Sequence, residues 1–185
     1  MGTRNLTIVK KNNELKVCQY GQWDGYPSGQ GATILKFCKD KFRLSQLRDV
    51  VDNIKNIEAL PEYIEEYDKL TPNWSNEPDN RTHQMKYHFS HLISRDIGGD
   101  ILDHILTVDR LSLPMVMNKE IYLQYYDVSK CTNYCDWSIE YAYVVNFDTN
   151  RLECYGYGRL LKSYSLNKLP TKERFVKELN DGEEE

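Results

Sequence analysis

Two glutamine amides and two aromatic rings lie close together in a short stretch near the N-terminus. In the segment QYGQWDGYPSGQG (residues 19–31), Gln22 and Gln30 carry amides that both donate and accept hydrogen bonds. Trp23 and Tyr26 lie between them and have rings that can stack on a planar ligand. Amides and rings together suit recognition of a base. The segment is therefore a candidate binding site for a small nucleotide-derived ligand.

The same segment contains one carboxylate that could act on such a ligand. Asp24 can accept a hydrogen bond from a ribose hydroxyl, hold a metal ion weakly, or act as a general base. The sequence does not decide among these roles, so whether the protein is an enzyme stays open. Asp24 is the candidate catalytic residue only if the protein is an enzyme.

The glycine-rich end of the segment is predicted to enter a helix. Ser28 and Gly29 precede ATILKFCK (residues 32–39), which reads as a helix with Ser28 as its N-cap. Such an entrance exposes backbone N–H groups that favour an anion, and Gly29 and Gly31 would let a ligand approach the backbone closely. The spacing is not that of a phosphate-binding P-loop, and no Lys-Ser or Lys-Thr pair follows it.

Two arginines are candidates to join this site, and a purely structural interpretation stands beside the functional one. Arg4, near the first strand, and Arg95 carry the charges that could contact an anion. Each of them alone is more often a surface or paired residue. In the structural interpretation, Asp24-Gly25 starts a turn, Tyr26-Pro27 packs, and Ser28 caps a helix. Residue types alone leave both interpretations open.

The elements before and after the segment are predicted by periodicity. NLTIVK (residues 5–10) and ELKVCQY (residues 14–20) alternate and are separated by Lys-Asn-Asn, which predicts a β-hairpin. Apolar residues at helical spacing then predict further helices. These cover residues 44–57, a segment opened by Pro61, and residues 82–107 with an interruption at Gly98-Gly99. Residues 71–81 are the most loop-like stretch.

The end of the chain alternates again. Residues 137–147 alternate strictly, a turn follows, and residues 152–157 return as the partner strand. Residues 115–128 add one or two strands. The order predicts an α+β fold with an N-terminal β-hairpin, central helices and a C-terminal antiparallel β-meander, the helices packed on a mainly antiparallel sheet. We expect a single domain over residues 1–185, with a charged tail (about 171–185) that is a short helix or frayed.

Composition narrows the class of protein. The chain has 185 residues, a net charge of −4 and 14 tyrosines. An acidic chain without a basic stripe argues against a protein that binds duplex nucleic acid. No apolar run is long enough to cross a membrane. The five cysteines are an odd number and no secretory signal is visible, which predicts reduced thiols and a cytoplasmic protein (the host cytoplasm if a phage encodes it).

Other chemistry-bearing residues give weaker patterns. His88 and His91 are three apart on one helical face, but no Glu or Cys completes a ligand set with them, His83 or His104. Cys131-x3-Cys135 lacks a second pair, so no metal and no cofactor is predicted. An N-terminal-nucleophile amidohydrolase would need processing to expose Thr3. No G-x-S-x-G elbow supports a serine triad.

Several motifs together resemble a known group of proteins. An N-terminal Gly-Thr-Arg (residues 2–4) occurs with QWDGYPSGQG (residues 22–31), SRDIG (residues 94–98) and EYAYVV (residues 140–145). This combination resembles a family of small, mostly uncharacterised proteins of bacteriophages and bacteria, with relatives in some fungi. The resemblance implies that the DGYPSGQG turn is characteristic of the group. The phage setting implies a counter-defence protein that sequesters or cleaves a host nucleotide immune signal.

The favoured prediction is thus a protein that binds a small nucleotide-like ligand at this turn. The alternatives are a protein-interaction module that binds a host protein through a tyrosine-rich face, and the amidohydrolase. The sequence does not fix the oligomeric state, and a homo-oligomer is among the partners considered. The predicted ligand-binding residues are Arg4, Gln22, Trp23, Tyr26, Ser28, Gly29, Gln30, Gly31 and Arg95.

Overall fold

A mixed five-stranded sheet forms the centre of the molecule. The computed structural model describes residues 2–56, 87–88, 90–92, 96–111, 121–123 and 139–183. The strands of the sheet are β1 (Asn5–Lys11), β2 (Glu14–Gly21), β5 (Tyr141–Asn146), β6 (Arg151–Gly156) and β7 (Arg159–Ser165). Their order is β2-β1-β5-β6-β7. Only the β1–β5 pairing is parallel, so the predicted hairpin, meander and mainly antiparallel sheet are confirmed.

The hairpin turn shows why the N-terminal prediction succeeded. Asn12 and Asn13 both have φ of 58°, a left-handed conformation that asparagine tolerates and that tight hairpin turns require. The carboxylate of Asp148, in the β5–β6 turn, accepts the N–H groups of Asn12 at 2.7 Å and of Asn13 at 3.0 Å. The two turns are therefore joined at one end of the sheet.

Most of the other described elements are helices or helical turns. They are the π-helical turn η1 (Pro27–Gly31), α1 (Ala32–Lys39), α2 (Lys41–Val50), the 3-10 turns η2 (Val51–Asn53) and η3 (Gly98–Asp100), α5 (Ile101–Leu111) and α7 (Lys172–Asp181). The longer helix expected over residues 44–57 is wrong at its end. Ile54 begins strand β3 (Ile54–Asn56), which pairs in parallel with β4 (Ile121–Leu123).

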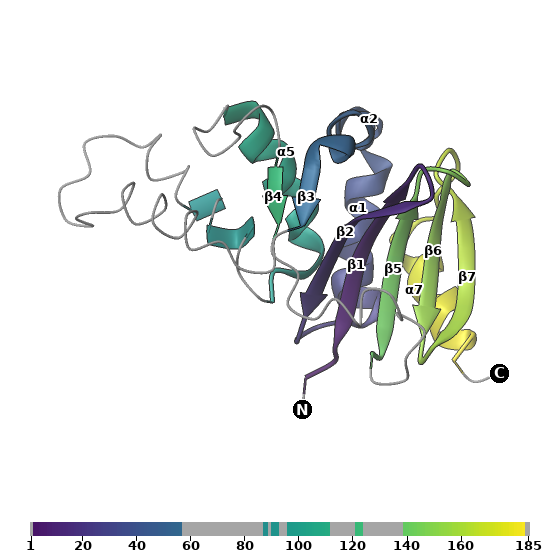
Figure 1. Cartoon of the computed structure of the whole chain (residues 1–185). Coiled ribbons are helices and arrows are strands. Elements are labelled where there is room, and N and C mark those ends of the chain that lie inside the picture. The colour runs from purple at the N-terminus through teal and green to yellow at the C-terminus, as the bar shows by residue number, and fades with distance from the viewer. Residues whose placement is uncertain are drawn as a thin grey trace.

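The helices pack against one face of the sheet. Figure 1 shows α1 and α7 together behind the five strands, with α7 crossing behind β6 and β7. The inward side of α7 carries Phe175 and Leu179, both fully buried. Its start is capped by the Thr171 hydroxyl, which accepts the Arg174 N–H at 3.3 Å. The charged tail was expected to be a short helix or frayed, and residues 172–181 are helical.

Among the described cysteines, one differs from expectation. Cys38 and Cys154 are free and buried, as small apolar side chains in the core. Cys18, however, forms a disulfide. The prediction of five reduced thiols is wrong for this residue, because sequence spacing does not show which side chains meet in space.

Some predictions lie outside the described residues. These are the segment opened by Pro61, the loop at residues 71–81, and Cys131 with Cys135. The strand expected from residue 137 begins at Tyr141 in the described part, and β7 is an additional strand that the sequence analysis did not identify. Within the described ranges, none of the helices is long and apolar enough to cross a membrane.

Candidate functional site

The DGYPSGQG turn leaves the sheet and enters a helix, as predicted. Strand β2 ends at Gly21, and η1 leads directly into α1. Two hydrogen bonds hold the turn against the sheet. The Gly25 N–H donates to the Thr3 carbonyl at 3.0 Å, and the buried Tyr143 hydroxyl donates to the Gly25 carbonyl at 2.8 Å. The segment just before β1 and strand β5 thus fix the position of the turn.

The helix entrance differs from the predicted one in its cap. Tyr26, not Ser28, occupies the N-cap position, and no side chain caps it. Pro27 takes the first helical position, where its missing N–H costs nothing. The N-cap role predicted for Ser28 is therefore wrong. Ser28 instead lies inside η1 with an exposed side chain.

The backbone N–H groups of this entrance are already bonded. Those of Gly29 and Gly31 donate to the Tyr26 carbonyl at 3.0 and 3.3 Å. That of Gln30 donates to the Asp24 carbonyl at 2.8 Å. The turn thus uses these donors itself, and the predicted anion contact from the Gly29–Gly31 backbone stays a prediction.

Close packing inside the protein explains two of the glycines. A Cβ on Gly29 would lie 2.3 Å from the Asp24 carbonyl oxygen. A Cβ on Gly31 would lie 2.8 Å from the ring of Tyr143. The sequence analysis predicted a close approach at both residues, with a ligand as the neighbour. The structure puts the protein's own backbone and core there.

Arg4 is committed to an ion pair. Its Nε lies 2.9 Å from Glu140 Oε2, and its Nη2 donates to Glu140 Oε1 at 3.0 Å. Burial would raise the pKa of Glu140, but the hydrogen bonds and charge of Arg4 and the backbone N–H groups lower it. Arg4 therefore connects the N-terminus to the start of β5. Arg95 lies outside the described residues.

The two motif glutamines also make contacts within the protein. The Gln22 N–H donates to Asp96 Oδ1 at 2.9 Å, and Gln22 Oε1 accepts the Tyr20 hydroxyl at 2.5 Å. Gln30 Oε1 accepts the Gly99 N–H at 2.8 Å. Parts of the motif that are distant in sequence thus meet at this turn.

The two candidate stacking rings are exposed but lie away from the cavity that the turn lines. Trp23 is 60% exposed and Tyr26 is 52% exposed. The Tyr26 ring centroid is 6.2 Å from that of Tyr141 on β5. Neither Trp23 nor Tyr26 lines the cavity described next. Their predicted role in stacking on a ligand stays a prediction.

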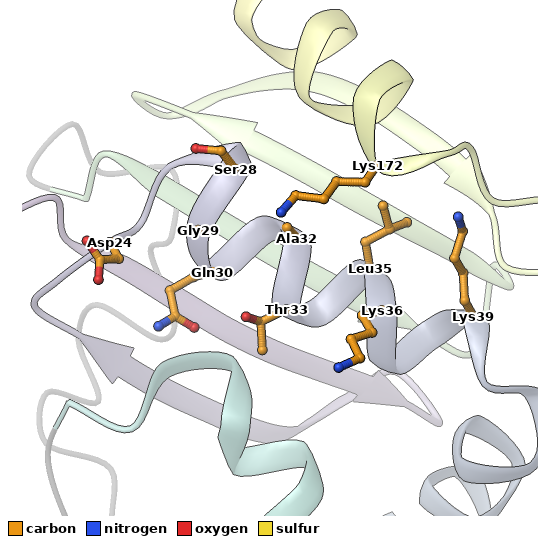
Figure 2. A pocket seen from close by; sticks show the side chains of 10 residues that line it. All are labelled: Asp24, Ser28, Gly29, Gln30, Ala32, Thr33, Leu35, Lys36, Lys39 and Lys172. Carbon is orange, nitrogen blue, oxygen red and sulfur yellow. The ribbon is translucent and has the colours of Figure 1, made fainter.

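A groove of about 540 Å³ runs along α1 beside the turn. Figure 2 shows Asp24 and Gln30 near the start of the helix and Lys39 near its end, with Lys172 reaching across from α7. The predicted residues Asp24, Ser28, Gly29 and Gln30 are all on its wall. The full lining is Asp24, Ser28, Gly29, Gln30, Ala32, Thr33, Leu35, Lys36, Lys39 and Lys172.

Three lysines give the groove a positive charge that the sequence analysis missed. Among the described residues, no carboxylate forms a salt bridge with Lys36, Lys39 or Lys172. The pKa of Glu173 is lowered first by its hydrogen bonds with backbone N–H and the Thr171 hydroxyl, and then by the charges of Lys39 and Lys172. Lys36 and Lys39 are three residues apart in the helix that follows the motif, so the sequence alone gave a signal that they share one helix face. Lys172 gave none, because only the fold brings it here.

Asp24 has the geometry of a turn residue and the exposure of a site residue. Its φ of 55° is left-handed, and its carbonyl accepts the Gln30 N–H. Its side chain is exposed on the wall of the groove. Backbone and side chain therefore have separate roles, and the carboxylate is available to a ligand.

No metal site accompanies the groove in the part of the chain that the structure describes. There, no three His, Cys, Asp or Glu side chains are grouped so that they could hold a metal ion. Comparisons of this chain with protein-family models, curated proteins and solved structures find no match.

Proposed function

We propose that this protein binds a small anionic, nucleotide-derived ligand in the groove between the DGYPSGQG turn, α1 and α7. The observation that carries the proposal is the lining of the groove. Three ammonium groups that form no salt bridge with a described carboxylate share one wall with the exposed Asp24 carboxylate and small polar side chains. A cavity of this size suits a ligand of nucleotide dimensions.

The distribution of charge suggests how such a ligand would lie. Lys36, Lys39 and Lys172 supply hydrogen-bond donors and positive charge for phosphate oxygens. Asp24, toward the other end of the groove, suits a ribose hydroxyl, which can donate to a carboxylate. Ser28 and Thr33 offer hydroxyl groups beside the helix. We therefore place the phosphates beside the three lysines along α1 and the sugar beside Asp24.

A structural role for two of the lysines is the main competing explanation. Lys36 and Lys39 lie in the last turn of α1, where a positive charge complements the helix dipole. That role needs no ligand. It predicts that replacing these lysines lowers helix stability by a few tenths of a kcal/mol to about 1 kcal/mol, with no effect on any binding.

The test is a panel of linear nucleotides, cyclic nucleotides and inorganic pyrophosphate. Binding is measured by thermal shift and calorimetry, and the recovered ligand is chromatographed. The variant replaces Lys36, Lys39 and Lys172 with Gln. The matched control is Lys177→Gln on α7, an exposed lysine outside the groove.

We expect at least one nucleotide to bind the wild-type protein and the control. We expect the triple variant to bind it at least tenfold more weakly, a loss of about 1.4 kcal/mol. Recovered intact ligand indicates sequestering, and altered ligand indicates cleavage. No binding by the wild-type protein across the panel, or equal binding by the triple variant, would refute the proposal.

The exposed tyrosines favour a second candidate function. Tyr26 and Tyr157 are each 52% exposed and flank Tyr141 at centroid distances of 6.2 and 6.1 Å. Exposed tyrosines of this kind suit a protein-binding surface, such as that of a module binding a host protein. A Tyr26→Ser, Tyr157→Ser variant that loses a captured partner, while the lysine variant keeps it, would favour this candidate.

The two remaining hypotheses have narrower support. The counter-defence setting depends on the family resemblance alone. The amidohydrolase would need an accessible Thr3, which is 8% exposed and whose carbonyl accepts the Gly25 N–H. No observation on the described residues favours the amidohydrolase.

A further inference from the structure

Three histidines from two helical segments pack against one another near α5. His104 belongs to α5, and His88 and His91 belong to a second helical segment, described at residues 87–88 and 90–92. The Nδ1 atoms of His88 and His104 are 2.6 Å apart. The ring centroids of His91 and His104 are 4.5 Å apart. The three imidazoles therefore form one contact between the two segments.

The hydrogen bond in this cluster limits its protonation. One Nδ1 of the His88–His104 pair must carry the hydrogen and the other must be bare to accept it. If both rings are protonated, two donors face each other and the bond is lost. The contact between the segments thus depends on at least one neutral imidazole.

The surroundings favour the neutral forms. Tyr87 lies 4.3 to 5.6 Å, centroid to centroid, from all three imidazoles, and His104 is only 7% exposed. The His91 Nε2 is buried and has no hydrogen-bond partner among the described residues. Burial first, and then the charges of His91 and His88, lower the pKa of His104 to about 4.

Two other charged groups act on the cluster. Arg110, also on α5, lowers the pKa of His88, but less than burial and His91 do. Burial lowers the pKa of His91, and the charge of Asp100 in η3 raises it by a smaller amount. One carboxylate is too little to neutralise a cluster carrying two or three protons. Protonation in acid would therefore weaken this contact.

We propose that His88, His91 and His104 form an acid-sensitive latch that holds the helical segment described at residues 87–88 and 90–92 on α5 at neutral pH and releases it on acidification. The latch is connected to the wall of the proposed groove through α5 and η3. Helix α5 follows η3, whose Gly99 N–H donates to Gln30 on the groove wall. The latch does not depend on the proposed ligand.

The experiment is hydrogen exchange of the whole protein at about pH 7.5 and about pH 5, corrected for the intrinsic exchange rate. The variant is His104→Asn, whose amide can still hydrogen-bond near the Nδ1 position but does not titrate. The same samples are measured with a chelator and with added Zn²⁺. NMR titration of the wild-type histidine rings gives their pKa values without relying on any variant.

We expect the amides of residues 87–92 to lose at least tenfold of their protection at the lower pH, while β5 and β6 keep theirs. The loss should be much smaller in His104→Asn. Equal protection at both pH values would overturn the proposal, as would three ring pKa values at the ordinary value or above. Zn²⁺ that binds the cluster and keeps the segment protected at both pH values would assign it to metal binding instead, and would also overturn the proposal.

Discussion

Removing one buried hydroxyl tests how the DGYPSGQG turn is held. Tyr143 is fully buried in β5, and its hydroxyl donates to the Gly25 carbonyl at 2.8 Å. Tyr143→Phe deletes only this oxygen. The ring still packs 6.5 Å, centroid to centroid, from Phe175. The variant thus leaves a buried carbonyl without the donor that the structure gives it.

The expected cost follows from that geometry. Losing one partner of a buried hydrogen bond costs about 1–3 kcal/mol, because the remaining group stays desolvated. For a domain of this size, 1 kcal/mol lowers Tm by about 2–4 °C. We therefore expect Tyr143→Phe to lower the unfolding free energy by about 2 kcal/mol and Tm by about 4–8 °C.

The assay is urea unfolding and calorimetry of both proteins at neutral pH. Tyr157→Phe is the matched control, because its ring is 52% exposed and its hydroxyl has no hydrogen bond to the described residues. The control should change stability by less than about 0.5 kcal/mol. If Tyr143→Phe is as stable as the control, the hydroxyl does not anchor the turn and the reasoning fails.

Three further predictions concern charge and thiols. Asp24→Asn should keep Tm within a few degrees, because Asn tolerates the left-handed φ of 55°. Nucleotide affinity should fall about ten- to a hundredfold if the carboxylate accepts a hydrogen bond from the ligand. Unchanged binding in calorimetry would exclude that role. From about pH 7.5 to about pH 5, the unfolding free energy should fall by about 2 kcal/mol. The reason is that the pKa of His104 is about 4 in the folded chain and 6.5 in the unfolded chain, so the unfolded chain binds more protons in this window. Urea titrations that show no fall would contradict this pKa difference. Without reduction, the denatured protein should show three reactive thiols of its five cysteines, since the Cys18 disulfide takes two; five would exclude the disulfide.

Local patterns predicted most of the described sheet. The alternation of β1 and β2 and the Asn12-Asn13 turn depend on neighbouring residues, and so do β5 and β6. Ile54 was misplaced because its apolar spacing continues that of α2, whereas its strand pairs with residue 121, far along the chain. Such pairing decides between helix and strand, and one sequence does not show it.

The candidate site was predictable only in part, for the same reason. The predicted residues that line the groove come shortly before α1 in the sequence, and α1 forms the groove's wall. They are Asp24, Ser28, Gly29 and Gln30. Arg4 was expected at an anion, but its partner Glu140 is 136 residues away in sequence. Lys172 comes from the last helix and was not considered. Contacts between parts of the chain that are distant in sequence decided both outcomes.

The structure also changes what the motif itself argues for. Gly29 and Gly31 are explained by Asp24 and Tyr143, and the backbone N–H groups by the turn's own carbonyls. These residues would be needed whether or not a ligand binds, so their presence no longer supports a site. The Asp24 carboxylate and the ammonium groups of Lys36, Lys39 and Lys172 remain, since among the described residues no carboxylate forms a salt bridge with these lysines. A functional role therefore depends on charges around the motif, which can be removed while the turn stays intact.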